Sequence, residues 1–486
     1  MNVYFTDWFD VSPDDLEAYG AFNISLINDL PVFIDPFLLF SSDKPEYQAL
    51  HEKIISYITF LREMSESGTI SKGLVQHWFL FPEVKQNWLG FSRVGNSGSG
   101  LGAKFAAALN NNLSTIFTDF GVEQVTKGSH LEKLCLVKDG VGKDNVSDFT
   151  TNLIKGFLCE YTQEFAKLHI DSCRTKSVMV AHAEFDYVTR RWRGKRYILP
   201  YIDVDYVLLT PKDILTKDEA WINKHDIIGD FDEILASVSN MVLRAQINEY
   251  FLRRVPERAK QREVNEAISA TLRKFPELID FYIRLKEDHS KEATSLSTQK
   301  VREIETVFIG QVSRLIEDLR DRSAFYTTPD DSFEEAYKRV MFLKQVIENN
   351  DGYRIFYVKG EPIKRESDLQ LMFRLTWYAS EHDVNAEVNN GRGPVDYKIS
   401  RGSKDSTLVE FKLASNSKLK QNLEHQVEVY KAANTTENSI KIILYFSDSE
   451  LSKVLKIMRD LKLKEGKELV LIDAQATNKP SGSNAK

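Results

Sequence analysis

The sequence predicts a multidomain protein of mixed α/β class, with an N-terminal α/β domain, a helical middle segment and a C-terminal core ordered α-β-β-β-α-β. The length of 486 residues suggests about three domains. A hydrophobic fraction of 42% beside a charged fraction of 28% is typical of a folded globular chain and excludes a fully disordered or collagen-like one. The spacing of apolar residues also changes twice along the chain, which indicates where one kind of structure gives way to the next.

The N-terminal region, residues 1–230, mixes short apolar runs with Gly/Asn turns and is rich in aromatic residues. Residues 50–64 and 153–168 have apolar side chains at helical spacing, and residues 197–209 are typical of a strand that enters a core. We expect a mixed α/β domain with a role in sensing or in substrate capture. The pattern does not define its topology.

The middle segment, residues 231–350, is predicted to be helical. Apolar residues recur every three or four positions from Val301 to Leu319, with charged residues between them, which is the stripe of an amphipathic helix. Such a stripe could pair with a second copy of the chain, so a homodimer through this segment is one interpretation. Because the stripe covers only about three heptads, packing within the chain is the simpler expectation.

Charge and cysteine content exclude several classes of protein. The formal net charge is −7, so the chain as a whole lacks the basic character of a dedicated DNA-binding domain, although residues 351–486 carry 22 basic and 19 acidic side chains. Cys135, Cys159 and Cys173 form no CxxC pair, which argues against zinc-ribbon and thioredoxin-like sites. The acidic, aromatic start and the lack of a long apolar run predict a cytoplasmic protein without a membrane partner.

The C-terminal region has the clearest pattern, and we predict a domain over residues 351–475 followed by a disordered tail at 476–486. Apolar spacing predicts, in order, a helix, three strands, a second helix and a fourth strand. An Asn-Gly turn signal separates the first two strands. The predicted elements cover residues 366–380, 384–389, 394–399, 407–413, 419–433 and 440–446.

Two neighbouring strands of this region carry a group of charged side chains. Residues two apart in a strand point to the same face, so Glu410 and Lys412 share one face of the third strand. Asp396 lies on the preceding strand, which we expect to pair with the third. Carboxylates crowded together repel each other unless a cation neutralises them, and ligands that are all oxygen favour Mg²⁺ or Mn²⁺ over zinc. The residues therefore predict a divalent-cation site with an amine beside it.

Helix geometry adds further candidates. Glu366 begins the first predicted helix and shares a face with Gln370 one turn later. Gln426 and Tyr430 are likewise four residues apart in the second helix. These side chains could hold the lysine, a water molecule or a backbone phosphate. A purely structural role for Tyr430 is the alternative, because tyrosine is common in helices.

These motifs resemble those of the PD-(D/E)XK nuclease superfamily. Pro394-Val395-Asp396, followed after a gap of 14 residues by Glu410-Phe411-Lys412, is similar to the motif that gives the superfamily its name. The predicted order of elements is that of its restriction-endonuclease-like core. Residues 426–430 look like the QxxxY element of its RecB-like branch. The resemblance covers roughly residues 351–450.

The resemblance implies hydrolysis of phosphodiester bonds in nucleic acid with Mg²⁺ or Mn²⁺ as cofactor. In it, Asp396 and Glu410 are metal ligands and Lys412 is the catalytic lysine. Glu366 stands where an acid of the first helix often lies. Arg392, in a Gly-Arg-Gly turn, is placed to contact a phosphate.

A second basic run lies in the N-terminal region and includes Arg190, Arg191, Trp192 and Arg193. Basic groups with an interleaved Trp can contact phosphates and stack on bases, so these four residues are candidates for nucleic-acid binding. A solvated β-turn is the alternative. In the first case, the N-terminal region helps to capture the substrate.

Together these features predict a Mg²⁺-dependent nuclease in bacterial antiviral defence or restriction, with DNA as the expected substrate and RNA as the open alternative. The defence role rests on similarity of architecture and not on any residue. Two alternatives stay open: a binding or scaffold protein whose nuclease-like domain no longer cuts, and a nuclease active only with a partner protein or a bound ligand. In a third, Glu410 and Lys412 form an exposed ion pair on a solvated sheet face, which would contribute little.

Overall fold

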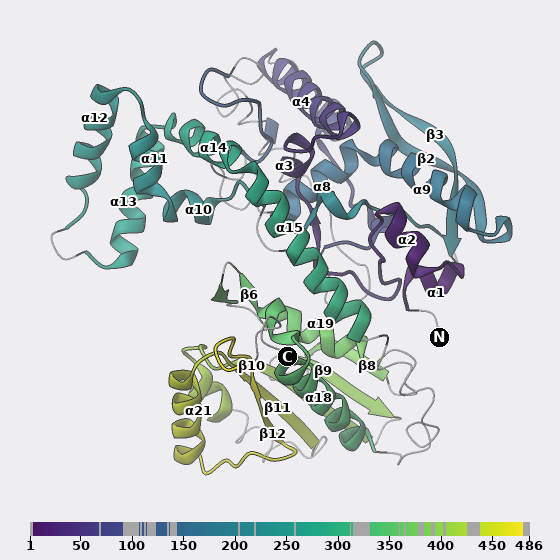
Figure 1. Ribbon diagram of the computed structural model, residues 1–486, viewed down its shortest axis with the longest axis vertical. Helices are drawn as coiled ribbons and strands as arrows, with labels where there is room; N and C mark the ends of the chain where they lie inside the picture. The colour runs from purple at the N-terminus through teal and green to yellow at the C-terminus, as the bar shows by residue number, and fades with distance from the viewer. Residues whose placement is uncertain are drawn as a thin grey trace, which may run out of the picture.

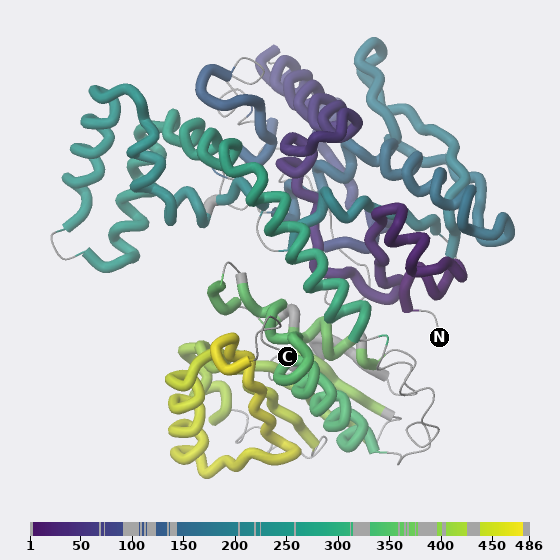
Figure 2. Tube along the Cα trace, viewed as in Figure 1, coloured from purple at the N-terminus to yellow at the C-terminus, as the bar shows by residue number. Residues whose placement is uncertain are grey.

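The computed structural model contains helices and strands along most of the chain, as expected for the mixed α/β class. Its described residues are 3–67, 70–90, 106, 109–110, 113, 123–133, 136, 143–202, 205–217, 220–256, 259–311, 313, 331–358, 360–363, 366–377, 383–389, 394–401, 405–424 and 438–479. In Figure 1 the described residues up to 304 lie mainly in an upper body and those from 332 onward form a lower one, as the colours of Figure 2 show. The predicted tail lies largely outside the described residues.

The N-terminal body packs helices around a long β-hairpin. The hairpin joins β2 (Thr175–Asp186) and β3 (Arg191–Ile202), each of 12 residues, and β3 also pairs with β4 (Asp205–Tyr206). A second small sheet pairs β1 (Phe33–Ile34) with β5 (Leu215–Thr216). The helices are α1 (Phe5–Phe9), α2 (Pro13–Tyr19), α3 (Pro36–Phe40), α4 (Pro45–Glu66), α5 (Lys72–Phe79), α8 (Lys143–Leu153) and α9 (Lys155–His169).

Two of these helices confirm the sequence prediction. The helix expected at residues 50–64 lies within α4, which begins at a proline, a residue well suited to the first helical position. Its apolar residues at helical spacing, Ile54, Ile58 and Leu61 among them, are buried in the core. The helix expected at 153–168 corresponds to α9 and the end of α8.

The middle segment is helical in its described residues, as predicted. Its helices are α11 (Phe231–Ser237), α12 (Met241–Leu252), α13 (Gln261–Lys274), α14 (Leu278–Asp288) and α15 (Ser290–Ile304), and a π-helical segment, η4 (Glu305–Gln311), follows them. A further helix, α10 (Lys224–Gly229), lies directly before this segment. The apolar stripe of α15 and η4 is buried: Val301, Ile304 and Phe308 belong to the main core. These three residues therefore pack within the chain, which agrees with the expectation of internal packing and not with a dimer interface at these positions.

The C-terminal part is built on a five-stranded sheet in the order β12-β11-β10-β9-β8. Strands β8, β9 and β10 are antiparallel neighbours, whereas β10, β11 and β12 run parallel. Its elements are η5 (Gly352–Phe356), β6 (Tyr357–Val358), β7 (Glu361–Pro362), α19 (Ser367–Leu375), β8 (Asp383–Asn389), β9 (Pro394–Arg401), β10 (Asp405–Leu413), helical residues 419–424, β11 (Asn438–Tyr445), α21 (Asp448–Asp460) and β12 (Leu469–Asp473).

Helices cover both faces of this sheet. One face packs with α19 and with α18 (Ser332–Asn349), which contacts β9 to β12. The other face packs with α21 and residues 419–424 in a separate apolar cluster. The sequence prediction placed α18 in the middle segment, because one amphipathic helix resembles another until its packing partner is known. None of the helices that the structure describes is both long enough and apolar enough to cross a membrane.

Candidate functional site

The candidate site lies where two strands of the C-terminal sheet part. The described ladder between β9 and β10 runs from Arg401–Asp405 to Tyr397–Val409 and ends there. Beyond that pair, β10 continues beside β11 as far as Leu413. The edge of β10 that faced β9 therefore needs other partners for its backbone amides, since a buried amide without an acceptor is costly.

Two carboxylates take the place of the missing strand. The amide of Phe411 donates to Asp396 Oδ2 at 2.6 Å, and the amide of Leu413 donates to Glu366 Oε1 at 3.0 Å. Because the amide of Phe411 belongs to the peptide bond that follows Glu410, the carboxylate of Asp396 lies against the backbone of Glu410. The structure thus brings three of the predicted acids to one edge of β10.

Strand alternation places the remaining groups as predicted. Val409, Phe411 and Leu413 turn to the main apolar core, so Glu410 and Lys412 occupy the opposite face of β10. Glu410 is only 4% exposed, which contradicts the alternative of an exposed ion pair on a solvated sheet face.

The structure adds Lys441, a residue that the sequence analysis missed. Its position in β11 is opposite Glu410 in the parallel register, and it too is buried. Burial lowers the pKa of Lys441, and the negative charges of Glu410 and Glu468 oppose that shift. A signal was present in the sequence, because Lys441 is the one charged residue in the otherwise apolar run 440–446.

The carboxylate of Glu366 is electrostatically linked to the other groups. Burial raises its pKa, and the negative charge of Asp396 adds to that effect. The positive charge of Lys412 and the hydrogen bond from the amide of Leu413 act in the opposite direction. Glu366, Asp396 and Lys412 therefore lie close enough to influence one another's charge.

The donor set can be compared with the needs of a divalent cation. Within the described residues, no three His, Cys, Asp or Glu side chains are already grouped so that they could hold a metal ion. Mg²⁺ does not require such a cage, since it usually binds one or two carboxylates and completes its shell with water and substrate phosphate. The oxygen donors of Asp396 and Glu410 fit a site of that kind, although one oxygen of Asp396, like one of Glu366, already accepts a strand amide.

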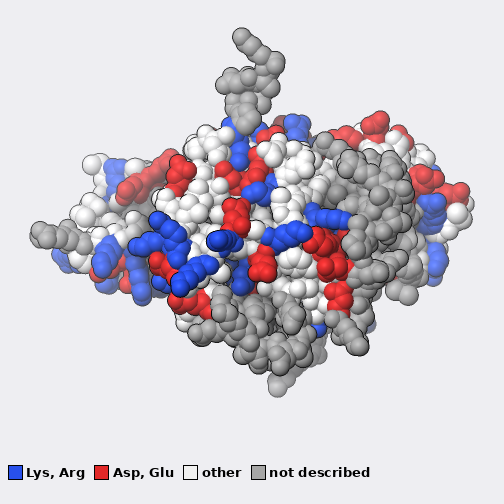
Figure 3. Space-filling view, turned by 90° about the horizontal axis from the view of Figure 1, so that it is seen from below, with Lys and Arg blue, Asp and Glu red and all other residues white. Residues whose placement is uncertain are grey.

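Several predicted site residues lie outside the described residues, namely Arg392, Gln426 and Tyr430. Their roles stay predictions. The charge on the lower end of the molecule is mixed: in Figure 3, which views the molecule from the end that is lowest in Figure 1, the described Lys and Arg side chains are interspersed with Asp and Glu.

The basic run of the N-terminal body is divided by the β-hairpin. Arg190 is in the turn between β2 and β3, whereas Arg191, Trp192 and Arg193 are in β3. The Trp192 ring packs 5.2 Å from that of Tyr57, centroid to centroid, and its Nε1 donates to the Tyr57 hydroxyl at 3.2 Å. The Trp192 side chain therefore packs against Tyr57 within the N-terminal body.

The arginines of this run also differ from one another. All three arginines are exposed, but Arg193 forms an ion pair with Asp186 on β2. In Figure 1 the hairpin stands at the upper end of the molecule and the five-stranded sheet at the lower end. The structure does not bring this run to the candidate site.

Two family models match the chain, and both describe domains of unknown function. The first, DUF8370, matches residues 10–223, which cover most of the N-terminal body. The second, DUF8371, matches residues 332–448, from the start of α18 to the start of α21, and so includes the candidate site. Comparisons with curated proteins and with solved structures gave no match.

Proposed function

We propose that the C-terminal part of this protein is a metal-dependent nuclease that hydrolyses phosphodiester bonds, with DNA as the expected substrate and RNA as the alternative. One observation carries the proposal: Asp396 and Glu366 meet the edge of β10 beside Glu410 and Lys412, where β9 and β10 part. The order of elements around this edge supports a restriction-endonuclease-like core, as does the sheet that changes from antiparallel to parallel at β10.

Each residue has a distinct part in this proposal. Asp396 and Glu410 would hold Mg²⁺ or Mn²⁺, an ion that lowers the pKa of a bound water and offsets charge on the phosphate. Lys412 supplies a positive charge beside them, suited to orienting the attacking water or to stabilising developing negative charge. Glu366 acts as a positioning residue, because it holds the backbone of β10 at Leu413.

The wider role that we propose is bacterial antiviral defence or restriction, with the N-terminal body as the sensing or capturing part. The support is the arrangement of a separate N-terminal body and a C-terminal sheet domain, which is an argument from architecture. Dependence on a partner protein or a ligand is compatible with the same arrangement.

The competing proposal is that the protein binds nucleic acid without cleaving it. The hydrogen bonds at the site are compatible with this proposal as well. Asp396 and Glu366 each accept a hydrogen bond from a strand amide, so in this proposal both carboxylates only stabilise the edge of β10. The two accounts differ in what the charge of Asp396 does. An asparagine keeps an oxygen acceptor for the Phe411 amide but is a much poorer ligand for a hard cation.

The substitution Asp396→Asn therefore separates the two accounts. We expect the full-length protein to degrade DNA with Mg²⁺ and not with EDTA, and Asp396→Asn to reduce the rate at least about 100-fold, equivalent to about 3 kcal/mol. The melting temperature of the variant should stay close to that of the wild type. Duplex DNA, single-stranded DNA and RNA are assayed in parallel.

Asp405→Asn is the matched control. Asp405 also lies in β10 and also accepts a backbone amide, that of Ser332 at 2.9 Å, but it is at the other end of the strand. Its substitution should leave the rate of cleavage unchanged. Full activity in Asp396→Asn, or an equal loss in Asp405→Asn, would contradict the proposed site.

A further inference from the structure

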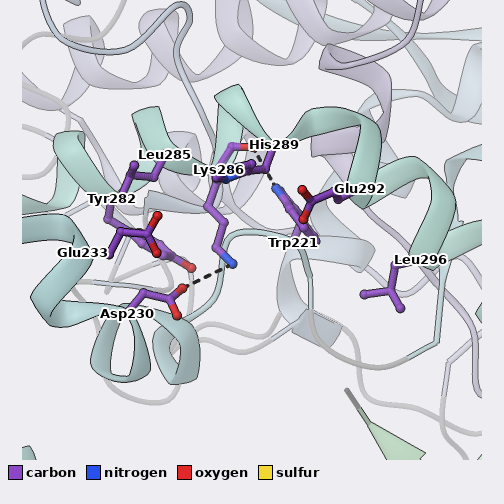
Figure 4. Close-up of a pocket in the computed structure, with 9 residues that line it drawn as sticks. All are labelled: Trp221, Asp230, Glu233, Tyr282, Leu285, Lys286, His289, Glu292 and Leu296. Carbon is purple, nitrogen blue, oxygen red and sulfur yellow. Dashed lines mark hydrogen bonds and ion pairs between the residues drawn. The ribbon is translucent and has the colours of Figure 1, made fainter. Parts of the chain in front are cut away.

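A pocket of about 440 Å³ lies among the middle helices, away from the candidate nuclease site. Figure 4 shows residues that line it, from the segment before α10, from α11 and α14, and from the first turns of α15. Its size is within the range of small-molecule sites, which usually combine an apolar floor with a few placed polar groups.

The floor of the pocket is aromatic and held in place. Trp221 is fixed at both ends, because its backbone amide donates to Asp35 Oδ2 at 2.7 Å and its Nε1 donates to the carbonyl of Lys286 at 3.0 Å. Tyr282 is fully buried, and its hydroxyl both accepts from and donates to the backbone of Asn223. A ligand would thus meet a surface that needs little rearrangement.

The single lysine of the pocket is already neutralised. Lys286 Nζ lies 2.5 Å from Asp226 Oδ2 and 3.8 Å from Asp230 Oδ2. It also lies 4.6 Å from the centroid of the Trp221 ring, a cation–π contact. Because Lys286 and Asp226 are both buried, this pair belongs to the structure of the pocket and leaves no positive charge for an anionic ligand.

Two carboxylates at the mouth of the pocket are in the opposite situation. Glu233 and Glu292 are exposed, and in the part of the chain that the structure describes neither forms an ion pair. Figure 4 shows Glu233 with Asp230 on one side of Lys286 and Glu292 on the other side, beside Trp221. The pocket therefore has negative charge at two separated places, with Lys286 and the Trp221 ring between them.

We propose that this pocket binds a small linear polyamine. Two ammonium groups would meet the carboxylates of Glu233 and Glu292, and the methylene chain between them would lie over Trp221. Burial of the methylenes and the attraction of cations to an indole face favour the same ligand. An anionic ligand such as a nucleotide would meet the carboxylates of Glu233 and Glu292, because the charge of Lys286 is already paired with Asp226.

Isothermal titration of the full-length protein with spermidine and putrescine tests this site. The Asp396→Asn variant in metal-free buffer serves as the background, so that the result does not depend on whether the C-terminal part is a nuclease. We expect saturable binding of spermidine, tighter than that of putrescine and weakened by salt, because two ion pairs near the surface are screened. Butane-1,4-diol, a neutral analogue of putrescine, should not bind.

Variants of the two glutamates locate the binding. The double substitution Glu233→Gln and Glu292→Gln removes both charges at nearly unchanged size and should weaken spermidine binding at least about tenfold. Asp232→Asn is the matched control, since Asp232 is the exposed neighbour of Glu233 on α11 and does not line the pocket. Circular dichroism should show the same helix content in all variants.

Three outcomes would overturn the proposal. The first is the absence of saturable binding of spermidine, and the second is an equal loss of affinity in Asp232→Asn. The third is tighter binding of a lysine-rich peptide than of spermidine at equal charge, which would assign the pocket to a partner protein instead of a free polyamine.

Discussion

The edge of β10 and the β2–β3 hairpin both carry charged residues that the sequence marks as functional, but only the first brings them together. At the sheet edge, Asp396 and Glu366 accept the alternate backbone amides of Phe411 and Leu413 in one strand, next to Glu410 and Lys412. In the hairpin, Trp192 is committed to packing. The comparison teaches that strand alternation predicts a shared face well, whereas a basic run in the sequence says little about which side chains are available.

Of the variants proposed here, Lys412→Met at the edge of β10 should have the largest effect, and it tests whether the residues gathered there are catalytic. If Lys412 supplies charge to the reaction, its loss should lower the rate of Mg²⁺-dependent DNA cleavage about 1,000-fold, within the range of a lost catalytic side chain. The measurement is single-turnover cleavage, with Lys464→Met, an exposed lysine beyond α21, as control. Retention of activity would place the chemistry elsewhere.

Trp192→Ala tests the hairpin as a structural element. The ring packs against Tyr57, Phe81 and Phe185, so its removal should lower the free energy of unfolding by about 3 kcal/mol. Urea titration followed by circular dichroism measures this. As a control, Arg191→Ala at the preceding position should change the free energy of unfolding by less than about 0.5 kcal/mol. A Trp192→Ala variant that is as stable as the wild type but has lost affinity for DNA would indicate that Trp192 stacks on bases of the nucleic acid.

The exposed arginines of the β2–β3 hairpin offer a second test, with a smaller expected effect: whether the hairpin binds nucleic acid. If Arg190 and Arg191 each contact a phosphate, the double alanine variant should bind DNA more weakly at low salt and should lower the salt slope of log K by about two. Fluorescence anisotropy over a salt series, on the Asp396→Asn background, measures this slope. An unchanged slope would mean that the hairpin does not hold nucleic acid.

Glu366→Gln should give the smallest effect, which depends on pH. Burial raises the pKa of Glu366, so the folded state takes up a proton more readily than the unfolded chain. The stabilising contribution is therefore present at low pH and is lost as pH rises through the raised pKa. Gln cannot titrate but can still accept the Leu413 amide, so the wild type should lose stability relative to the variant as pH rises. Urea titrations at several pH values test the sign.

Much of the C-terminal fold could be predicted from the sequence, because its antiparallel strands are consecutive and alternate between apolar and polar residues. This pattern placed Glu410 and Lys412 on one face and Asp396 on the neighbouring strand. The pattern could not predict that β9 leaves β10 after Val409, since the end of a ladder depends on three-dimensional twist. It also missed the proximity of Lys441, because parallel register is fixed by a connection whose path the sequence does not show.

The helices illustrate the same limit. The predicted helical segment 231–350 includes α15 and α18, but the prediction did not place α18 against the C-terminal sheet. The pocket around Trp221 was not predicted either, because its wall residues are far apart in the sequence and meet only after α11, α14 and α15 have packed.

The most direct test of the account is anomalous diffraction from crystals of the protein soaked in Mn²⁺. We predict a single strong anomalous peak in contact with the carboxylates of Asp396 and Glu410, at the edge of β10, and its loss in Asp396→Asn. Crystals that show no manganese at that edge under conditions in which the protein cleaves DNA would contradict the account.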